Sequence, residues 1–147
     1  MSDLAKLRAA VKPNTRMIWV ETPTNPTLKL LDIQAICAVA KEHNLIAVSD
    51  NTFASPFLQS PLLLGASISY NSMTKYIGGH SDVVGGSLTT NDKELFDKIF
   101  FIAMCKCPLT QPPEAVSVLL TRSCSFGDSR PCPCVSTSAR RPLCRWR

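Results

Sequence analysis

The stretch "SMTKYIGGHSD", which runs from Ser72 to Asp82, combines the residue types of a cofactor site. It places Lys75 just after two hydroxyl residues, Ser72 and Thr74, and shortly before a pair of glycines. A lysine that holds a phosphate-bearing cofactor needs hydroxyl donors and a backbone that can approach closely, which glycine permits. Lys75 is therefore a candidate for binding such a cofactor covalently.

A second group of polar residues, Asp50 and Thr52, follows a short apolar run. A carboxylate at one strand end and a lysine at another form the pair that pyridoxal phosphate chemistry requires. A buried carboxylate such as Asp50 keeps the ring nitrogen of that cofactor protonated, so that the ring can withdraw electrons. Lys75 would form the Schiff base and then move protons near the reacting carbon, while Ser72 and Thr74 would donate to the phosphate.

Short apolar runs and periodic segments alternate along the first part of the chain, which predicts an α/β fold with a mostly parallel sheet. In such a sheet, ligands bind at the carboxyl ends of the strands, so the polar residues there are expected to converge. Asn25, in the Pro-rich turn "ETPTNP", follows the first run and belongs to the same set. We predict strands at 16–21, 45–50, 67–72 and 83–90, and helices at 31–44 and 92–104.

Each of these residues has a plainer interpretation when taken alone. An aspartate after a strand often forms a turn, as does an asparagine in a Pro-rich loop, and a lysine beside glycines is usually solvated. The run His80, Ser81 and Asp82 contains the residue types of a hydrolase triad, but three consecutive residues cannot converge as triad members do. No single residue therefore decides the function.

The composition is that of a globular domain, with 147 residues of which 45% are hydrophobic. No apolar run reaches the roughly 18 residues of a membrane span, and the start "MSDLAKLRAA" lacks the apolar stretch of a secretory signal. We therefore expect a cytoplasmic protein that does not bind a membrane. The net charge of +5 arises largely in the last residues, so it does not predict a nucleic-acid partner for the folded part.

The motifs "ETPTNP", "SDNTFASP" and "SMTKYIGGHSDVVGG" together resemble, in order and spacing, the Cys/Met-metabolism family of pyridoxal-phosphate enzymes. Within that family they resemble the branch of cystathionine gamma-lyases and gamma-synthases. The resemblance covers residues 5 to 104 and implies part of the large cofactor-binding domain of a fold-type I pyridoxal-phosphate-dependent transferase. We assign this partial domain to residues 1–104.

By this resemblance, Lys75 is the Schiff-base lysine and Asp50 is the partner of the pyridine nitrogen. Thr52 is expected against the ring face, while Ser72 and Thr74 are expected to reach the phosphate. The implied cofactor is pyridoxal 5′-phosphate, and no metal is implied.

The implied activity is cleavage of the carbon–sulfur bond of cystathionine to give cysteine, 2-oxobutanoate and ammonia. Asn25 would lie near the ring hydroxyl or the substrate carboxylate, and the implied assembly is a homotetramer. Two alternatives stay open: a transferase of the gamma-synthase type, and an inactive fragment that acts only by association with full-length subunits. Family members are longer, so the phosphate-cradling glycine loop, the ring-stacking tyrosine and the arginine that grips the substrate carboxylate are expected outside this sequence.

Residues 105–147 differ from the rest of the chain, since they hold six of the seven cysteines and no long periodic pattern. We expect no packed structure there. Read one base earlier, the codons of residues 123–135 can encode a segment that resembles the family, so we predict that the reading frame changes between Ala103 and Cys107. The cysteines in "CKC" and "CPC" are separated by one residue, which makes them poor partners for a tetrahedral metal site, so a cysteine-rich metal module is the less favoured alternative. The basic end "ARRPLCRWR" is expected to be solvated.

Overall fold

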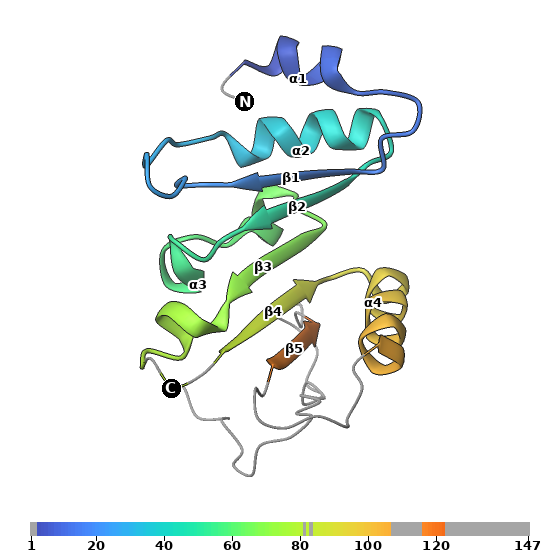
Figure 1. The fold of residues 1–147 in the computed structure, drawn as a ribbon. Coiled ribbons are helices and arrows are strands. Elements are labelled where there is room, and N and C mark those ends of the chain that lie inside the picture. Colours follow the sequence, from blue (N-terminus) through green and yellow to red (C-terminus); the bar gives the residue numbers. More distant parts are fainter. Residues whose placement is uncertain (1–2, 81, 83, 107–115, 123–147) are drawn as a thin grey trace.

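The computed structural model describes residues 3–80, 82, 84–106 and 116–122, which form a five-stranded sheet flanked by helices (Figure 1). The strands lie in the order β1-β2-β3-β4-β5. The pair β3 and β4 is antiparallel and the other neighbours are parallel, as expected for a mostly parallel sheet. Their bounds are Met17–Glu21 (β1), Ile46–Asp50 (β2), Ile68–Ser72 (β3), Val84–Thr90 (β4) and Val116–Arg122 (β5).

Helix α2 (Ile33–Glu42) covers one face of β1 and β2 and supplies most of the core. It begins after Asp32, whose carboxylate caps the helix by accepting the Ala35 N–H over 2.9 Å. Alternate residues of β1 are buried against the helix because successive strand side chains point to opposite faces. The core consists of Leu7, Ile18, Val20, Ile33, Ile36, Cys37, Val39, Ala40, Ala47 and Ala66.

Two further helices flank the sheet. Helix α1 (Leu4–Ala10), which was not predicted from the sequence, is a short helix that Asp3 caps and that lies over α2 in Figure 1. The ion pair between Arg8 and Glu42, at 3.0 Å, joins α1 to the end of α2. Helix α4 (Lys93–Lys106) lies beside β4 and β5, where a helix was predicted.

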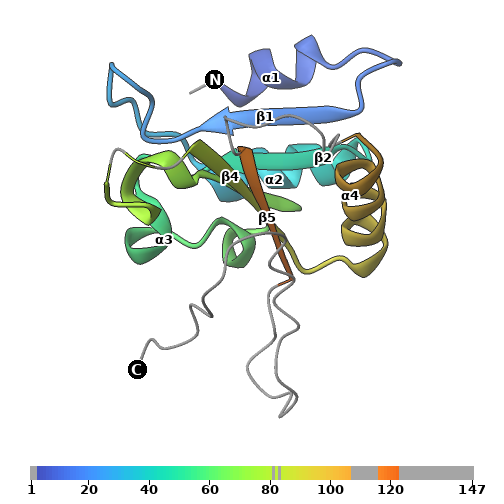
Figure 2. The same ribbon diagram turned by 60° about the horizontal axis from the view of Figure 1, so that its bottom comes forward.

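Two short helical turns lie between β2 and β3 along the chain, and a third follows β3. They are α3 (Ser55–Leu58), the 3-10 turn η1 (Pro61–Leu64) and the π-type turn η2 (Met73–Ile77). Figure 2 shows α3, η2 and the loop after β1 together on the side away from α4. The loops that follow the first three strands are thus gathered at one end.

The expectation of no packed structure after Met104 is wrong for residues 116–122. These residues form β5, which pairs with β4 along its whole length. Strand formers such as valine and leucine dominate this segment, and an open strand edge offers unpaired backbone groups that such a segment satisfies. The rest of the predicted tail, 107–115 and 123–147, lies outside the described residues, and so do the basic end and all its cysteines except Cys105.

No helix within the described ranges is both long enough and apolar enough to cross a membrane.

Candidate functional site

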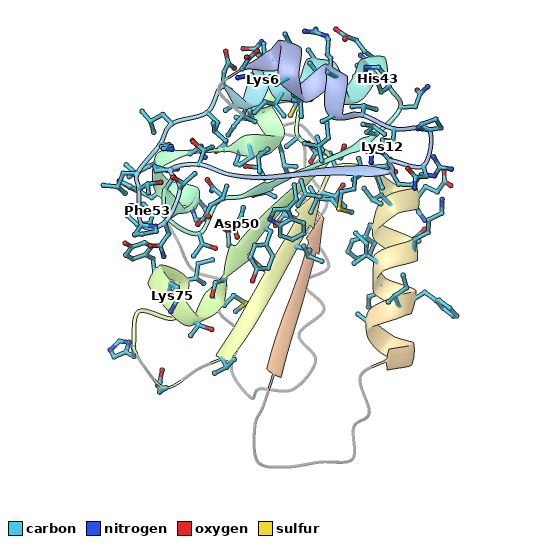
Figure 3. All side chains as sticks on the ribbon, turned by 45° about the horizontal axis from the view of Figure 1, so that its top comes forward. Lys6, Lys12, His43, Asp50, Phe53 and Lys75 are labelled. Carbon is cyan, nitrogen blue, oxygen red and sulfur yellow. The ribbon has the colours of Figure 1, made fainter. Side chains whose placement is uncertain are left out.

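The carboxyl ends of β1, β2 and β3 place the predicted site residues at one edge of the sheet. The strand register sets Glu21 beside Asp50 and Asp50 beside Tyr70. Figure 3 shows Asp50, Phe53 and Lys75 at this end of the sheet, while Lys12 lies at the other end. The convergence expected from the sequence is therefore present.

Lys75 lies in η2, directly after β3, and its side chain is exposed. The backbone leaves the helical region at this residue, with φ −96° and ψ −120°, so the turn is interrupted where the lysine projects. The chain is then reversed by bonds from Gly78 N to Met73 O (2.7 Å) and from Gly79 N to Lys75 O (2.9 Å).

Glycine is required at positions 78 and 79 for two different structural reasons. A Cβ at Gly78 would lie 2.6 Å from the Met73 carbonyl oxygen, so any side chain there would clash with backbone. Gly79 has φ +69°, a conformation that residues with a Cβ rarely adopt. The two glycines therefore allow the tight turn that follows Lys75 and leads into β4.

An open cavity of about 900 Å³ lies at this edge. Four of the six predicted site residues line it: Asn25, Thr52, Thr74 and Lys75. The other two, Asp50 and Ser72, do not line it, but both are bonded to Thr52. The remaining lining residues are Glu21, Phe53, Tyr76, Gly79, His80, Asp82 and Val84.

Thr52 connects the ends of two strands through its backbone and its hydroxyl. Its N–H donates to Asp50 Oδ1 over 3.0 Å, which fixes the orientation of that half-buried carboxylate. Its Oγ1 accepts the Ser72 N–H over 2.8 Å. The acid at the end of β2 and the segment that leads to Lys75 are therefore held by one residue.

The Thr74 hydroxyl anchors β4, a use that was not predicted. Its Oγ1 accepts the Gly85 N–H over 3.1 Å and lies 3.4 Å from the Gly85 carbonyl oxygen, to which it donates. The side chain thus joins η2 to β4 from within the cavity wall. Its predicted contact with a phosphate stays a prediction.

A buried amide network that sequence reasoning missed supports the loop after β2. Asn51 is 1% exposed, and its Nδ2 donates to the Gln59 carbonyl oxygen over 2.9 Å. Gln59 Nε2 lies within donating distance of Asn51 Oδ1 (2.8 Å) and of the Thr22 carbonyl oxygen (3.1 Å). An asparagine between Asp50 and Thr52 was a visible signal for this role, but the sequence gives no sign of Gln59.

The run from His80 to Asp82 forms no triad in the described residues. His80 and Asp82 are both exposed at the cavity rim, and Ser81 lies outside the described residues. The His80 Nδ1 lies 3.3 Å from the Gly78 carbonyl oxygen, which holds the ring against the turn. Within the described part of the chain, no group of three or more His, Cys, Asp or Glu residues is arranged to hold a metal ion.

The sequence matches a known family over most of its length. The family model described as "Cys/Met metabolism PLP-dependent enzyme" matches residues 1–123. This range extends past the interval from Ala103 to Cys107 where we expected the reading frame to change, and that hypothesis stays a prediction.

Curated relatives are similar over 102 residues, which are 69% of this chain. A protein described as probable cystathionine gamma-synthase from Herpetosiphon aurantiacus is 58% identical, and the matched part is 32% of its length. A cystathionine beta-lyase from Lactococcus lactis subsp. cremoris is 55% identical, with 27% of its length matched. The chain thus spans about a third or less of the length of these relatives.

Two solved structures resemble the fold. The structure of cystathionine gamma-lyase from Lactobacillus plantarum, complexed with L-serine, has a TM-score of 0.66 and 47% identity, and covers 69% of this chain and 26% of its own. The structure of metB from Corynebacterium glutamicum has a TM-score of 0.68 and 50% identity. The match covers 73% of this chain and 28% of the metB chain. The matched part of this chain therefore has the fold found in these proteins.

Proposed function

Because the chain belongs to the Cys/Met metabolism family of pyridoxal-phosphate-dependent enzymes, we propose that it carries the cofactor-binding part of a carbon–sulfur lyase. The proposed substrate is a thioether amino acid such as cystathionine, which reacts with one water to give cysteine, 2-oxobutanoate and ammonia. Pyridoxal 5′-phosphate is the cofactor of this family.

One observation carries the proposal: Lys75 shares a cavity with Asn25, Thr52 and Thr74, and Thr52 is bonded to Asp50. An amine, hydroxyl groups and an oriented carboxylate thus occur together at the ends of three neighbouring strands. This set of donors and acceptors fits a phosphorylated pyridine aldehyde, which needs a covalent anchor, a phosphate site and a partner for its ring nitrogen. When bound, such a cofactor supplies an electron sink for the carbanion at the substrate α carbon.

The residues of this chain have separate tasks in the proposal. The Lys75 Nζ holds the cofactor and, when free, moves a proton between the α and β carbons of the substrate. The Asp50 carboxylate, with Oδ1 held by the Thr52 N–H, has Oδ2 left for the protonated ring nitrogen. Thr52 would lie against the ring, Ser72 and Thr74 near the phosphate.

The second candidate reaction is a transfer of the gamma-synthase type. The relative described as a probable cystathionine gamma-synthase is 58% identical, and the one described as a cystathionine beta-lyase is 55% identical. Both reactions begin with the same proton removal at the α carbon, so the residues of this cavity suit either one. The products separate them, since the lyase forms 2-oxobutanoate and the synthase forms cystathionine from an activated homoserine and cysteine.

A third candidate role is association with full-length subunits without catalysis. Several large apolar side chains of the described residues are exposed, including Phe57 (93%) and Leu63 (85%). Covering exposed apolar side chains with another protein surface removes them from water, which favours association.

Addition of pyridoxal phosphate to the purified chain tests the proposal. We expect absorbance at the edge of the visible range that responds to cystathionine, with release of 2-oxobutanoate. Lys75→Ala should remove this absorbance, whereas Lys12→Ala, at the other end of the sheet, should leave it unchanged. A colourless wild type, or equal colour in Lys75→Ala, would count against the lyase and leave the association role.

A further inference from the structure

Glu21 and Asp50 place two carboxylates side by side at the ends of β1 and β2. They are direct partners in the parallel register, so both side chains leave the same face of the sheet. Neighbouring strands lie about 4.8 Å apart, which brings the two carboxylates within reach of one cation. Only one of the pair was predicted as a site residue from the sequence.

The two carboxylates have different surroundings. Asp50 is oriented by the Thr52 N–H, whereas the Glu21 side chain has no hydrogen bond or ion pair within the part of the chain that the structure describes. Glu21 is half-buried and lines the same cavity as Lys75. A half-buried carboxylate without a partner, aimed at the edge of a cavity, is suited to a positive charge on a ligand.

Apolar side chains lie beside the pair on the same face of the sheet. Tyr70 is the register partner of Asp50 on β3, and Trp19 precedes Glu21 by two residues on β1; their rings lie 5.4 Å apart at 52°. Val48, the register partner of Trp19 on β2, is 1% exposed. Trp19 is 48% exposed, so water still reaches this surface and a charge here is only partly shielded from solvent.

Three positively charged or titratable side chains lie near Glu21 and Asp50, but none forms an ion pair with either carboxylate in the described residues. Lys75 and His80 line the same cavity, and Lys29 lines a neighbouring hollow that Glu21 also borders. Asp82, at the rim, adds a further negative charge to the cavity.

We propose that Glu21 is a positioning residue of the cofactor site, which acts with Asp50 to keep the pyridine ring nitrogen protonated. Two adjacent carboxylates repel each other unless a cation lies close to both, and the protonated ring nitrogen is that cation. Glu21 raises the negative potential at Asp50 without needing to touch the ring. This inference rests on the proposed function, because it requires the cofactor to bind at this edge.

The protonation state of the ring nitrogen can be measured directly by NMR with 15N-labelled pyridoxal phosphate bound to the full chain. In Glu21→Gln, which keeps the size and shape of the side chain, we expect the 15N signal to change to that of the neutral ring about one pH unit lower than in the wild type. In Glu21→Asp, which keeps the negative charge, the pH of this transition should lie between the values for Glu21→Gln and the wild type. Glu42→Gln, at the distant end of α2, is the matched control and should titrate like the wild type.

The outcomes separate this inference from the proposed function. Suppose that Asp50→Asn lowers the pH at which the ring nitrogen loses its proton but Glu21→Gln does not. The role of Glu21 is then refuted, and the cofactor site stands. If the wild type binds no labelled cofactor at Lys75, both are refuted. Circular dichroism spectra of each variant show whether its fold is retained, and a lowered titration in a folded Glu21→Gln protein supports the inference.

Discussion

The hydroxyl of Thr52 accepts the Ser72 N–H over 2.8 Å and so ties the end of β2 to the end of β3. The N–H of the same threonine orients the Asp50 carboxylate. Because Lys75 follows Ser72 by one turn, this contact sets where the lysine lies relative to the acid. The arrangement depends on a threonine or serine at this position, not only on the charged pair.

Thr52→Val should weaken this connection. The substitution keeps the side-chain shape but removes the acceptor, so the partly buried Ser72 N–H loses its partner. An unsatisfied backbone donor of this kind costs about 1–3 kcal/mol in the free energy of unfolding. Urea denaturation of the two proteins measures the difference. Thr52→Ser retains the oxygen and should lose less, and equal losses in the two variants would contradict the account.

Gly78→Ala should destabilise the turn after Lys75. The added Cβ would lie 2.6 Å from the Met73 carbonyl oxygen, and a backbone atom cannot move aside as a flexible side chain can. We expect a loss of about 1–3 kcal/mol in the free energy of unfolding, the usual range for overpacking. Gly86→Ala is the matched control, since its Cβ would contact the Tyr70 ring at 3.4 Å and should cost far less. A thermal melt in which Gly78→Ala equals the wild type would refute this assignment.

Ser49→Ala should leave the stability unchanged or raise it. Ser49 is 0% exposed, and its Oγ has no hydrogen-bond partner in the described residues. Removing a buried hydroxyl that lacks a partner removes its desolvation cost, while a small apolar group remains in its place. Asn51→Ala, at the neighbouring position, should instead lower the melting temperature, because it disrupts the bonds to Gln59. A clear loss of stability in Ser49→Ala would mean that the hydroxyl is satisfied after all.

The pair of Arg8 and Glu42 should make the attachment of α1 depend on pH. The hydrogen bond from Arg8 holds the pKa of Glu42 below its ordinary value. A carboxyl whose pKa is lowered by folding stabilises the fold fully above its unfolded pKa of about 4.3, and this stabilisation is lost as the pH falls through the folded value. The pair is exposed, so the effect is small.

Melting temperatures of the wild type and Glu42→Gln at neutral and at strongly acidic pH test this sign. The difference between them should be present at neutral pH and should vanish on acidification. A difference that stays constant over this range would show that Glu42 acts through packing and not through its charge.

The sheet was predictable from the sequence because its apolar runs and turn residues agree with one another. The runs "RMIWVE" and "LIAVSD" end in polar residues, as β1 and β2 do, and α2 lies within the range where a helix was predicted. By contrast, β5 was missed because its stability comes from pairing with β4, which a single segment cannot reveal. Helix α1 was missed because it is short and because Glu42 of α2, to which its Arg8 is bonded, lies 34 residues further along the chain.

The site was predicted in its residue types but not in its connections. Lys75, Asp50 and Thr52 carry chemistry that their positions after strands make visible. The link from Thr52 to Ser72 and the partnership of Glu21 with Asp50 depend on strand register, which the sequence does not specify. A resemblance to a family therefore located the amine and the acid, while the sheet shows what holds them.

The most direct test of the central claim is to reduce the chain with borohydride in the presence of pyridoxal phosphate and to map the labelled peptide by mass spectrometry. The account predicts one pyridoxyl group on Lys75 at low cofactor concentration, and loss of that label in Asp50→Ala through weaker cofactor binding. Labels spread over surface lysines such as Lys6 and Lys12, or no label at Lys75, would contradict it.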